Sequence, residues 1–137
     1  MAALLSLEEG TRLLQICLEK ARSMGVRTSI AVVDASGIQV AAARMDGANL
    51  LSPDIAFGKA FAAAMFRRSG RELAEAWGPG HPVGAAMVAR TGGRFVAAQG
   101  SLVLRDGDEV VGAIGVSGAR SDQDEEIAQA GVDAFRR

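Results

Sequence analysis

Two groups of β-rich runs, each folded back on itself by a short turn that contains glycine, limit the folds open to this chain. Residues 28–34 (TSIAVVD) and 38–45 (IQVAAARM) flank an Ala-Ser-Gly turn. Residues 94–118 (RFVAAQGSLVLRDGDEVVGAIGVSG) read as a strand, a second strand, a tight turn at Asp106-Gly107 and a long third strand. Because such short turns join antiparallel neighbours, the sequence predicts an antiparallel sheet and not a parallel, doubly wound one.

Helical patterns surround these runs and predict an α+β fold with helices packed on the sheet. Ser6 and Glu9 have the spacing of a capping box, and the apolar periodicity that follows predicts a helix over residues 7–24, capped by Gly25. We expect Ser52 to be the N-cap of a second helix that ends at Gly70, with a further helical segment in GRELAEAW, residues 70–77.

The remaining elements of the chain are a turn and a final helix. Residues 78–84 (GPGHPVG) are the most turn-like stretch, since they hold two prolines and three glycines. Asp122 and Glu125 form a second capping-box pattern and predict the start of the C-terminal helix. The complete predicted order is α-β-β-α-α-β-β-β-α, which does not alternate strands with helices and so indicates an α+β layer fold.

Composition sets outer limits on what the chain does. Its 137 residues, 49% of them hydrophobic, suffice for one domain over 1–137 without a disulfide, and Cys17 is expected to be a buried apolar residue. A net charge of −1 with interspersed signs argues against nucleic-acid and anionic-membrane partners. The N-terminal residues lack the pattern of a signal peptide and no apolar run is long enough to span a bilayer, so we expect a cytoplasmic location.

The stretch GAIGVSGA, residues 112–119, has glycines at three-residue spacing but does not match a phosphate-binding loop. Ile114 and Val116 alternate with Gly115 and Ser117, so one face of the predicted strand is apolar and the other is nearly free of side chains. Another backbone, a helix or a flat ligand could approach that open face closely. Gly115 and Ser117 are therefore candidate ligand-binding residues.

Charged residues gather where the second predicted strand ends. Arg44 and Asp46 lie at that end, and Lys59 lies inside the helix that follows. If they converge, Arg44 and Lys59 could hold an anionic small molecule, and Asp46 could move a proton. The alternative is a turn salt bridge between Arg44 and Asp46, with Lys59 extending along its helix toward water.

His81 is the only histidine and lies in a loop between Gly80 and Pro82. It is a candidate acid–base group or axial haem ligand, although most isolated loop histidines are simply solvated. It cannot complete a two-histidine metal site, and we expect no metal site of that kind.

Taken together, these motifs resemble the GlcG/HbpS haem-binding family, which includes the C-terminal domain of PduO-type corrinoid proteins. The resemblance runs from Leu7 to Ala134 and is carried by VVDASG, RMDG, SPDIAFGKAFAAA, DGDEVVGAIGVSGA and DQDEEIAQAG. It implies a profilin-like α+β fold with a five-stranded antiparallel sheet, homo-oligomers that are often octamers, and haem or corrinoid binding in some members.

Three functions remain open at this point. The first is a homo-oligomeric protein that binds a small molecule, with haem or another tetrapyrrole as the candidate cofactor. The second is a small enzyme that acts on an anionic carbonyl or carboxylate compound through Asp46 or His81. The third is an accessory subunit without a ligand. The family's usual GG.P element reads Gly100-Ser101-Leu102-Val103 here, and Ala62 replaces the usual threonine of KA.TA. These departures are as compatible with a pocket for a different small molecule as with one for haem.

Overall fold

Over residues 4–137, the computed structural model of the chain contains one four-stranded antiparallel sheet and five helices. The strands lie in the order β2-β1-β4-β3, so the two hairpins meet through the central pair β1 and β4. The elements along the chain are α1 (Leu7–Met24), β1 (Ser29–Asp34), β2 (Gln39–Arg44), α2 (Ser52–Phe66), α3 (Gly70–Trp77), α4 (Pro82–Arg90), β3 (Ser101–Asp106), β4 (Glu109–Ser117) and α5 (Ser121–Ala134).

The α+β class is confirmed, but the predicted five-stranded sheet is wrong because residues 94–100 do not form a strand. This segment packs against helices instead of pairing with β3. The amide of Val96 donates to the Gly58 carbonyl of α2 at 3.3 Å, and Phe95 is buried in a cluster with Leu73 of α3. A β-rich sequence therefore packs beside the sheet without adding a strand to it.

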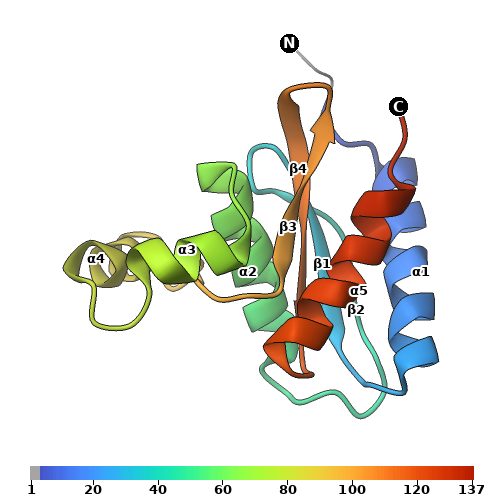
Figure 1. Cartoon of the computed structure of the whole chain (residues 1–137), viewed down its shortest axis with the longest axis horizontal. Helices are drawn as coiled ribbons and strands as arrows, with labels where there is room; N and C mark the ends of the chain where they lie inside the picture. Colours follow the sequence, from blue (N-terminus) through green and yellow to red (C-terminus); the bar gives the residue numbers. More distant parts are fainter. Residues whose placement is uncertain (1–3) are drawn as a thin grey trace.

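Helices cover both faces of the sheet (Figure 1). Ile30 and Val32 of β1 belong to the larger core cluster, which includes buried residues of α1 and α5. Ala31 and Val33 point the other way and pack with small residues of α2. Because both faces of β1 are covered, all six of its residues are buried. Cys17 of α1 is fully buried in the larger cluster, as predicted, and burial raises the pKa of its thiol to about 12.

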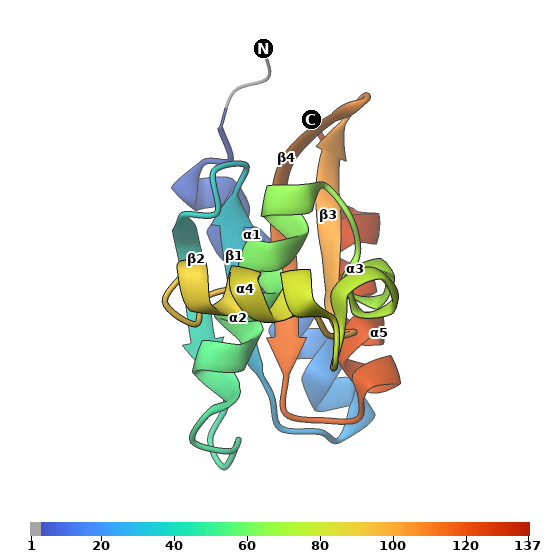
Figure 2. The ribbon, with the colours of Figure 1, turned by 90° about the vertical axis from the view of Figure 1, so that its left-hand side faces the viewer.

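Helices α3 and α4 lie beyond α2, on the side of the molecule away from α1 (Figures 1 and 2). The turn predicted within residues 78–84 is confirmed at residues 79–80, but the last part of that stretch is helical, since α4 begins at Pro82. Proline suits the first turn of a helix, where its missing N–H costs nothing. The predicted end of the second helix at Gly70 is wrong: α2 ends at Phe66, and Gly70 starts α3. The predicted N-cap at Ser52 is also wrong, since Leu51 is the N-cap and the Ser52 hydroxyl donates to the Asn49 carbonyl.

Helix caps explain most of the element boundaries. The capping box of Ser6 and Glu9 and the left-handed Gly25 (φ 70°) are confirmed at the two ends of α1. The box predicted at Asp122 is wrong, because the N-cap of α5 is Arg120, two residues earlier, and Asp122 instead pairs with the Arg120 guanidinium at 3.1 Å. No helix within residues 4–137 is both long enough and apolar enough to cross a membrane.

Candidate functional site

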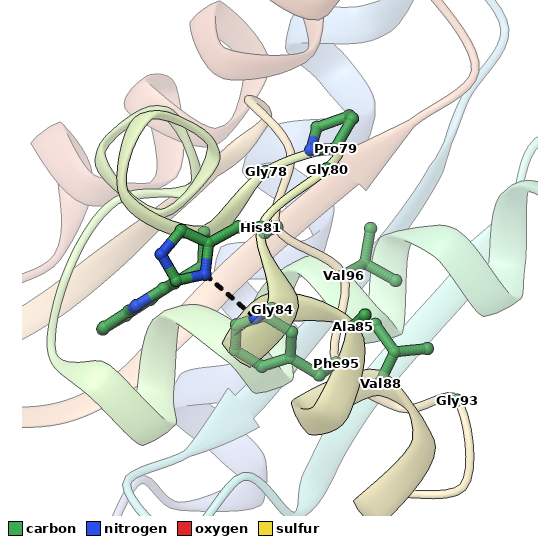
Figure 3. Close-up of a pocket in the computed structure, with 12 residues that line it drawn as sticks. Gly78, Pro79, Gly80, His81, Gly84, Ala85, Val88, Gly93, Phe95 and Val96 are labelled. Carbon is green, nitrogen blue, oxygen red and sulfur yellow. Dashed lines mark hydrogen bonds between the residues drawn. The ribbon is translucent and has the colours of Figure 1, made fainter.

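A hollow of about 370 Å³ opens beside His81, between α4 and the segment that leads to β3 (Figure 3). We call it the His81 hollow. Its walls come from the end of α3, the turn at 78–80, the inner side of α4 and residues 93–97. Most of these residues are apolar or glycine: Trp77, Gly78, Pro79, Gly80, Gly84, Ala85, Val88, Gly93, Phe95, Val96 and Ala97. A cavity of this size with one polar group suits a small organic ligand.

The His81 ring forms the N-cap of α4. Its Nδ1 accepts hydrogen bonds from the backbone amides of Val83 at 3.2 Å and Gly84 at 3.4 Å (Figure 3 draws the bond to Gly84). Because Nδ1 is the acceptor, the neutral ring carries its proton on Nε2. His81 therefore offers an N–H donor to any molecule that reaches Nε2.

An aromatic cluster supports the base of the hollow. The Phe66 ring lies 4.5 Å from the Trp77 ring and 5.7 Å from the Phe95 ring, measured between centroids. Leu73 completes the cluster and is fully buried. The cluster packs α3 and residues 94–97 against the end of α2, so it joins two walls of the hollow to the rest of the fold.

A second hollow, of about 500 Å³, lies at the other candidate site. It is lined by Leu18, Arg22, Arg27, Ala43, Arg44, Met45, Asp46 and Gly47, and we call it the arginine hollow. The structure thus brings together the predicted pair Arg44 and Asp46. The Arg44 guanidinium donates to the Ala48 carbonyl at 3.2 Å, and within residues 4–137 it forms no salt bridge with Asp46.

Lys59 does not join that pair. Its Nζ donates to the Val116 carbonyl of β4 at 2.9 Å and to the Asp124 carboxylate of α5 at 3.3 Å, and both side chains are buried. Burial lowers the pKa of Lys59 and raises the pKa of Asp124, and in each case the partner's charge opposes the shift. Lys59 therefore ties α2 to β4 and α5, whereas Arg44 lies on β2 at the far side of β1.

Gly115 and Ser117 lie on the α2 face of β4. A Cβ on Gly115 would lie 2.7 Å from the Ala60 amide nitrogen and 2.9 Å from the Ala60 Cβ, so the backbone of α2 occupies the open face of the strand. Ser117 is buried. Neither residue lines the His81 hollow or the arginine hollow, and their contact with a ligand stays a prediction.

The two predicted proton-transfer groups line different hollows, His81 on one side of the molecule and Asp46 on the other. Within residues 4–137, no group of three or more His, Cys, Asp or Glu side chains is arranged to hold a metal ion. Sequence reasoning missed Trp77, Val88 and Phe95 as walls of the His81 hollow. The available signal was Trp77 immediately before Gly-Pro-Gly-His, a large apolar residue at the entry to a tight turn.

Comparison with curated proteins gives one relative of similar length and one much longer relative that the chain matches only in part. The chain is 31% identical over 133 residues to a 15.0 kDa protein of Citrobacter freundii encoded in the dhaT–dhaS intergenic region, covering 97% of this chain and 93% of that protein. It is 30% identical over 132 residues to the corrinoid adenosyltransferase PduO of Salmonella typhimurium. That match covers 96% of this chain but only 39% of PduO.

Comparison with solved structures supports the same relationship. The structure of a PduOC–haem complex matches with a TM-score of 0.86 at 28% identity, over 97% of this chain and 96% of that one. A double mutant of Streptomyces reticuli HbpS matches with a TM-score of 0.84 at 30% identity, over 100% of this chain and 90% of that one. The family model described as "Haem degrading protein HbpS-like" matches residues 5–133. The chain therefore belongs to the HbpS-like family of haem-degrading proteins.

Proposed function

We propose that this protein binds a haem-type tetrapyrrole in the His81 hollow. The observation that carries the proposal is an apolar cavity of about 370 Å³ beside the only histidine of a chain in this family. A similar structure, that of PduOC, is a complex with haem. Trp77, Val88, Phe95 and Val96 offer apolar surface to a flat macrocycle, and the turn at 78–80 leaves one side of the hollow with few side chains.

His81 in its observed position does not fit the role of axial iron ligand. An axial histidine binds iron through a nitrogen lone pair, but Nδ1 is used by the helix cap and Nε2 carries the proton. The ring would have to leave the cap, or lose a second proton, to bind iron. In its observed position, His81 instead serves as a hydrogen-bond donor to an acceptor group of the ligand, such as a carboxylate.

Titration with hemin tests the proposal. Purified protein should give a saturable change in the Soret band, and Val88→Gln should weaken binding at least about fivefold, because it buries an amide against the apolar macrocycle. Ile38→Gln is the matched control: Ile38 is 62% exposed in the β1–β2 turn, away from the hollow, and its substitution should leave the titration unchanged. The proposal fails if hemin causes no saturable change or if both variants bind like the parent protein.

We also propose that the protein forms homo-oligomers in which a second copy covers α4. Among the residues of α4, only Gly84 is buried, although the helix is largely apolar. Val83 is 51% exposed and Val88 is 43% exposed. A short helix with so few contacts gains little stability from its own hydrogen bonds, so a partner surface is the physical reason we give for its apolar sequence.

A further inference from the structure

We infer that the arginine hollow is a second binding site, which takes a small organic anion with at least two negative charges. The hollow is built where three segments meet. The last turns of α1 supply Leu18 and Arg22, the α1–β1 connection supplies Arg27, and the end of β2 with its following loop supplies residues 43–47. Figure 1 places α1 and α4 at opposite sides of the molecule, so this hollow is separate from the His81 hollow.

The first argument is charge. Three guanidinium groups and one carboxylate line the hollow, a balance of +2 in a protein whose net charge is −1. Within the described residues, Arg22, Arg27 and Arg44 form no ion pair with a carboxylate. Like charges gathered at one hollow repel one another, and an anion bound between them removes that repulsion. Arg22 also lies in the last turn of α1, where a positive charge is favourable, but Arg27 and Arg44 have no such reason for their position.

The second argument is positioning, since Arg44 is hydrogen-bonded to the backbone and Arg27 lies against it. Arg44 donates one N–H to the Ala48 carbonyl at 3.2 Å, which leaves the rest of its guanidinium for a ligand. Arg27 lies across Gly47, where the backbone is left-handed (φ 83°): a Cβ there would lie 3.0 Å from the Arg27 Cδ and closer still to Nη1. Glycine at position 47 therefore makes room for the Arg27 side chain. Guanidinium groups bind carboxylate or phosphate through paired N–H donors, and the bond to Ala48 leaves such donors free on Arg44.

The third argument is the apolar part of the lining. Leu18, Ala43 and Met45 all contribute to the hollow, and its volume of about 500 Å³ exceeds the need of a bare inorganic ion. The lining therefore suits an organic molecule that joins an oxyanion end to an apolar body. Phosphate esters and dicarboxylates share this chemistry, and the experiment separates them.

The test is NMR titration of the full chain with two probes, inorganic pyrophosphate and citrate, at fixed ionic strength. Binding should shift the amide signals of residues 45–48 and the Nε–Hε signals of the three arginines. Arg44→Gln should weaken the affinity of the preferred probe about tenfold or more, as expected for loss of a charged hydrogen-bond donor. Stronger binding of pyrophosphate identifies a phosphate ester as the ligand class, and stronger binding of citrate identifies a carboxylate.

A control variant, Arg12→Gln, separates a specific site from general attraction of anions. Arg12→Gln changes the net charge by the same amount as Arg44→Gln. Like Arg44, Arg12 donates to a backbone carbonyl, that of Ala134 at 3.4 Å, but it lies on α1 outside the lining of the hollow. This variant should bind the probes like the parent protein. The inference is overturned if neither probe shifts these signals at millimolar concentration, or if Arg12→Gln weakens binding as much as Arg44→Gln. It is also overturned if Arg44→Gln abolishes hemin binding, because the hollow would then belong to the tetrapyrrole site. Hemin binding that fails in the parent protein, by contrast, contradicts only the proposed function.

Discussion

At His81, the first turn of α4 and the adjoining hollow depend on the same imidazole ring. Nδ1 accepts from two backbone amides, which would otherwise lack a partner at the helix start. Because Nδ1 is the acceptor, the N–H that the neutral ring offers to a ligand is on Nε2. The sequence could show that His81 is the only histidine, but not that it is a helix cap, because the start of α4 lies in the turn-like stretch 78–84.

Substitutions at His81 should separate the cap from the ligand contact. His81→Ala removes the cap and should make the first turn of α4 open more often. Its amides should then exchange with solvent about fivefold faster, as expected when the helix loses about 1 kcal/mol of stability. His81→Asn should keep the slower exchange, since Asn is a good N-cap, while it removes the imidazole. Hydrogen exchange followed by mass spectrometry measures the difference. Equal exchange in the parent and both variants would contradict the assignment of His81 as a cap.

Glu9 couples the start of α1 to the end of the chain, and its pair with Arg137 predicts a pH dependence. A hydrogen bond from the Arg137 guanidinium lowers the pKa of Glu9 from about 4.5 to about 2. A carboxylate with a lowered folded-state pKa contributes stability that is present above the unfolded value and is lost as the pH falls through the folded value. The stability advantage over Glu9→Gln should therefore be constant near neutral pH and shrink between about pH 4.5 and 2.

Urea unfolding of the parent protein and Glu9→Gln across that pH range measures this effect. Glutamine preserves the capping box with Ser6, so the comparison isolates the charge. A stability difference that stays constant from neutral pH to pH 2 would show that the ion pair contributes nothing.

At the scale of elements, the contact between α2 and β4 depends on the absence of side chains. Gly115 lies directly against the backbone of α2 near Ala56 and Ala60, and Ala63 and Ala64 continue the small-residue face of the helix. The alternation of Gly115 and Ser117 with apolar residues correctly indicated one open face on this strand. It did not indicate what covers that face, because a helix backbone and a flat ligand place the same demand on the strand.

Gly115→Ala tests this contact. The added Cβ would meet the backbone of α2, which moves less easily than the end of a flexible side chain. We expect the substitution to lower the free energy of unfolding by about 1–3 kcal/mol, the usual cost of overpacking a core. Urea denaturation measures it, and an unchanged midpoint would mean that α2 can move away from the sheet at little cost.

The sequence predicted element boundaries correctly where a full capping box or a tight turn marks them. The capping box of Ser6 and Glu9, the turn at Asp106-Gly107 and the pairing of both hairpins could all be predicted. The fifth strand could not be excluded, because residues 94–100 have strand-like composition and only their contact with α2 and α3 diverts them from the sheet. The hollow beside His81 was missed for the same reason, since residues 93–97 form one of its walls.

For the whole molecule, the exposed apolar surface of α4 predicts association. Val83→Glu should reduce the oligomer, because it puts a charge where the second copy is proposed to bind. Light scattering after size-exclusion chromatography gives the mass directly. Ile38→Glu, at an exposed apolar residue far from α4, is the matched control and should keep the parent mass. A parent protein that elutes as a monomer at high concentration would contradict the proposed oligomer.

The contact of Arg137 with Leu4 and Glu9 makes the fold suited to circular permutation. The Arg137 guanidinium binds the Leu4 carbonyl at 3.1 Å and the Glu9 carboxylate at 2.9 Å, so positions 4 and 137 are neighbours in space. A short Gly/Ser linker could join them into a ring, which could then be opened at the exposed Gly92-Gly93 turn. In such a circular permutant, Gly93 would become the first residue and Gly92 the last. Both hairpins and all core helices would keep their order around the ring.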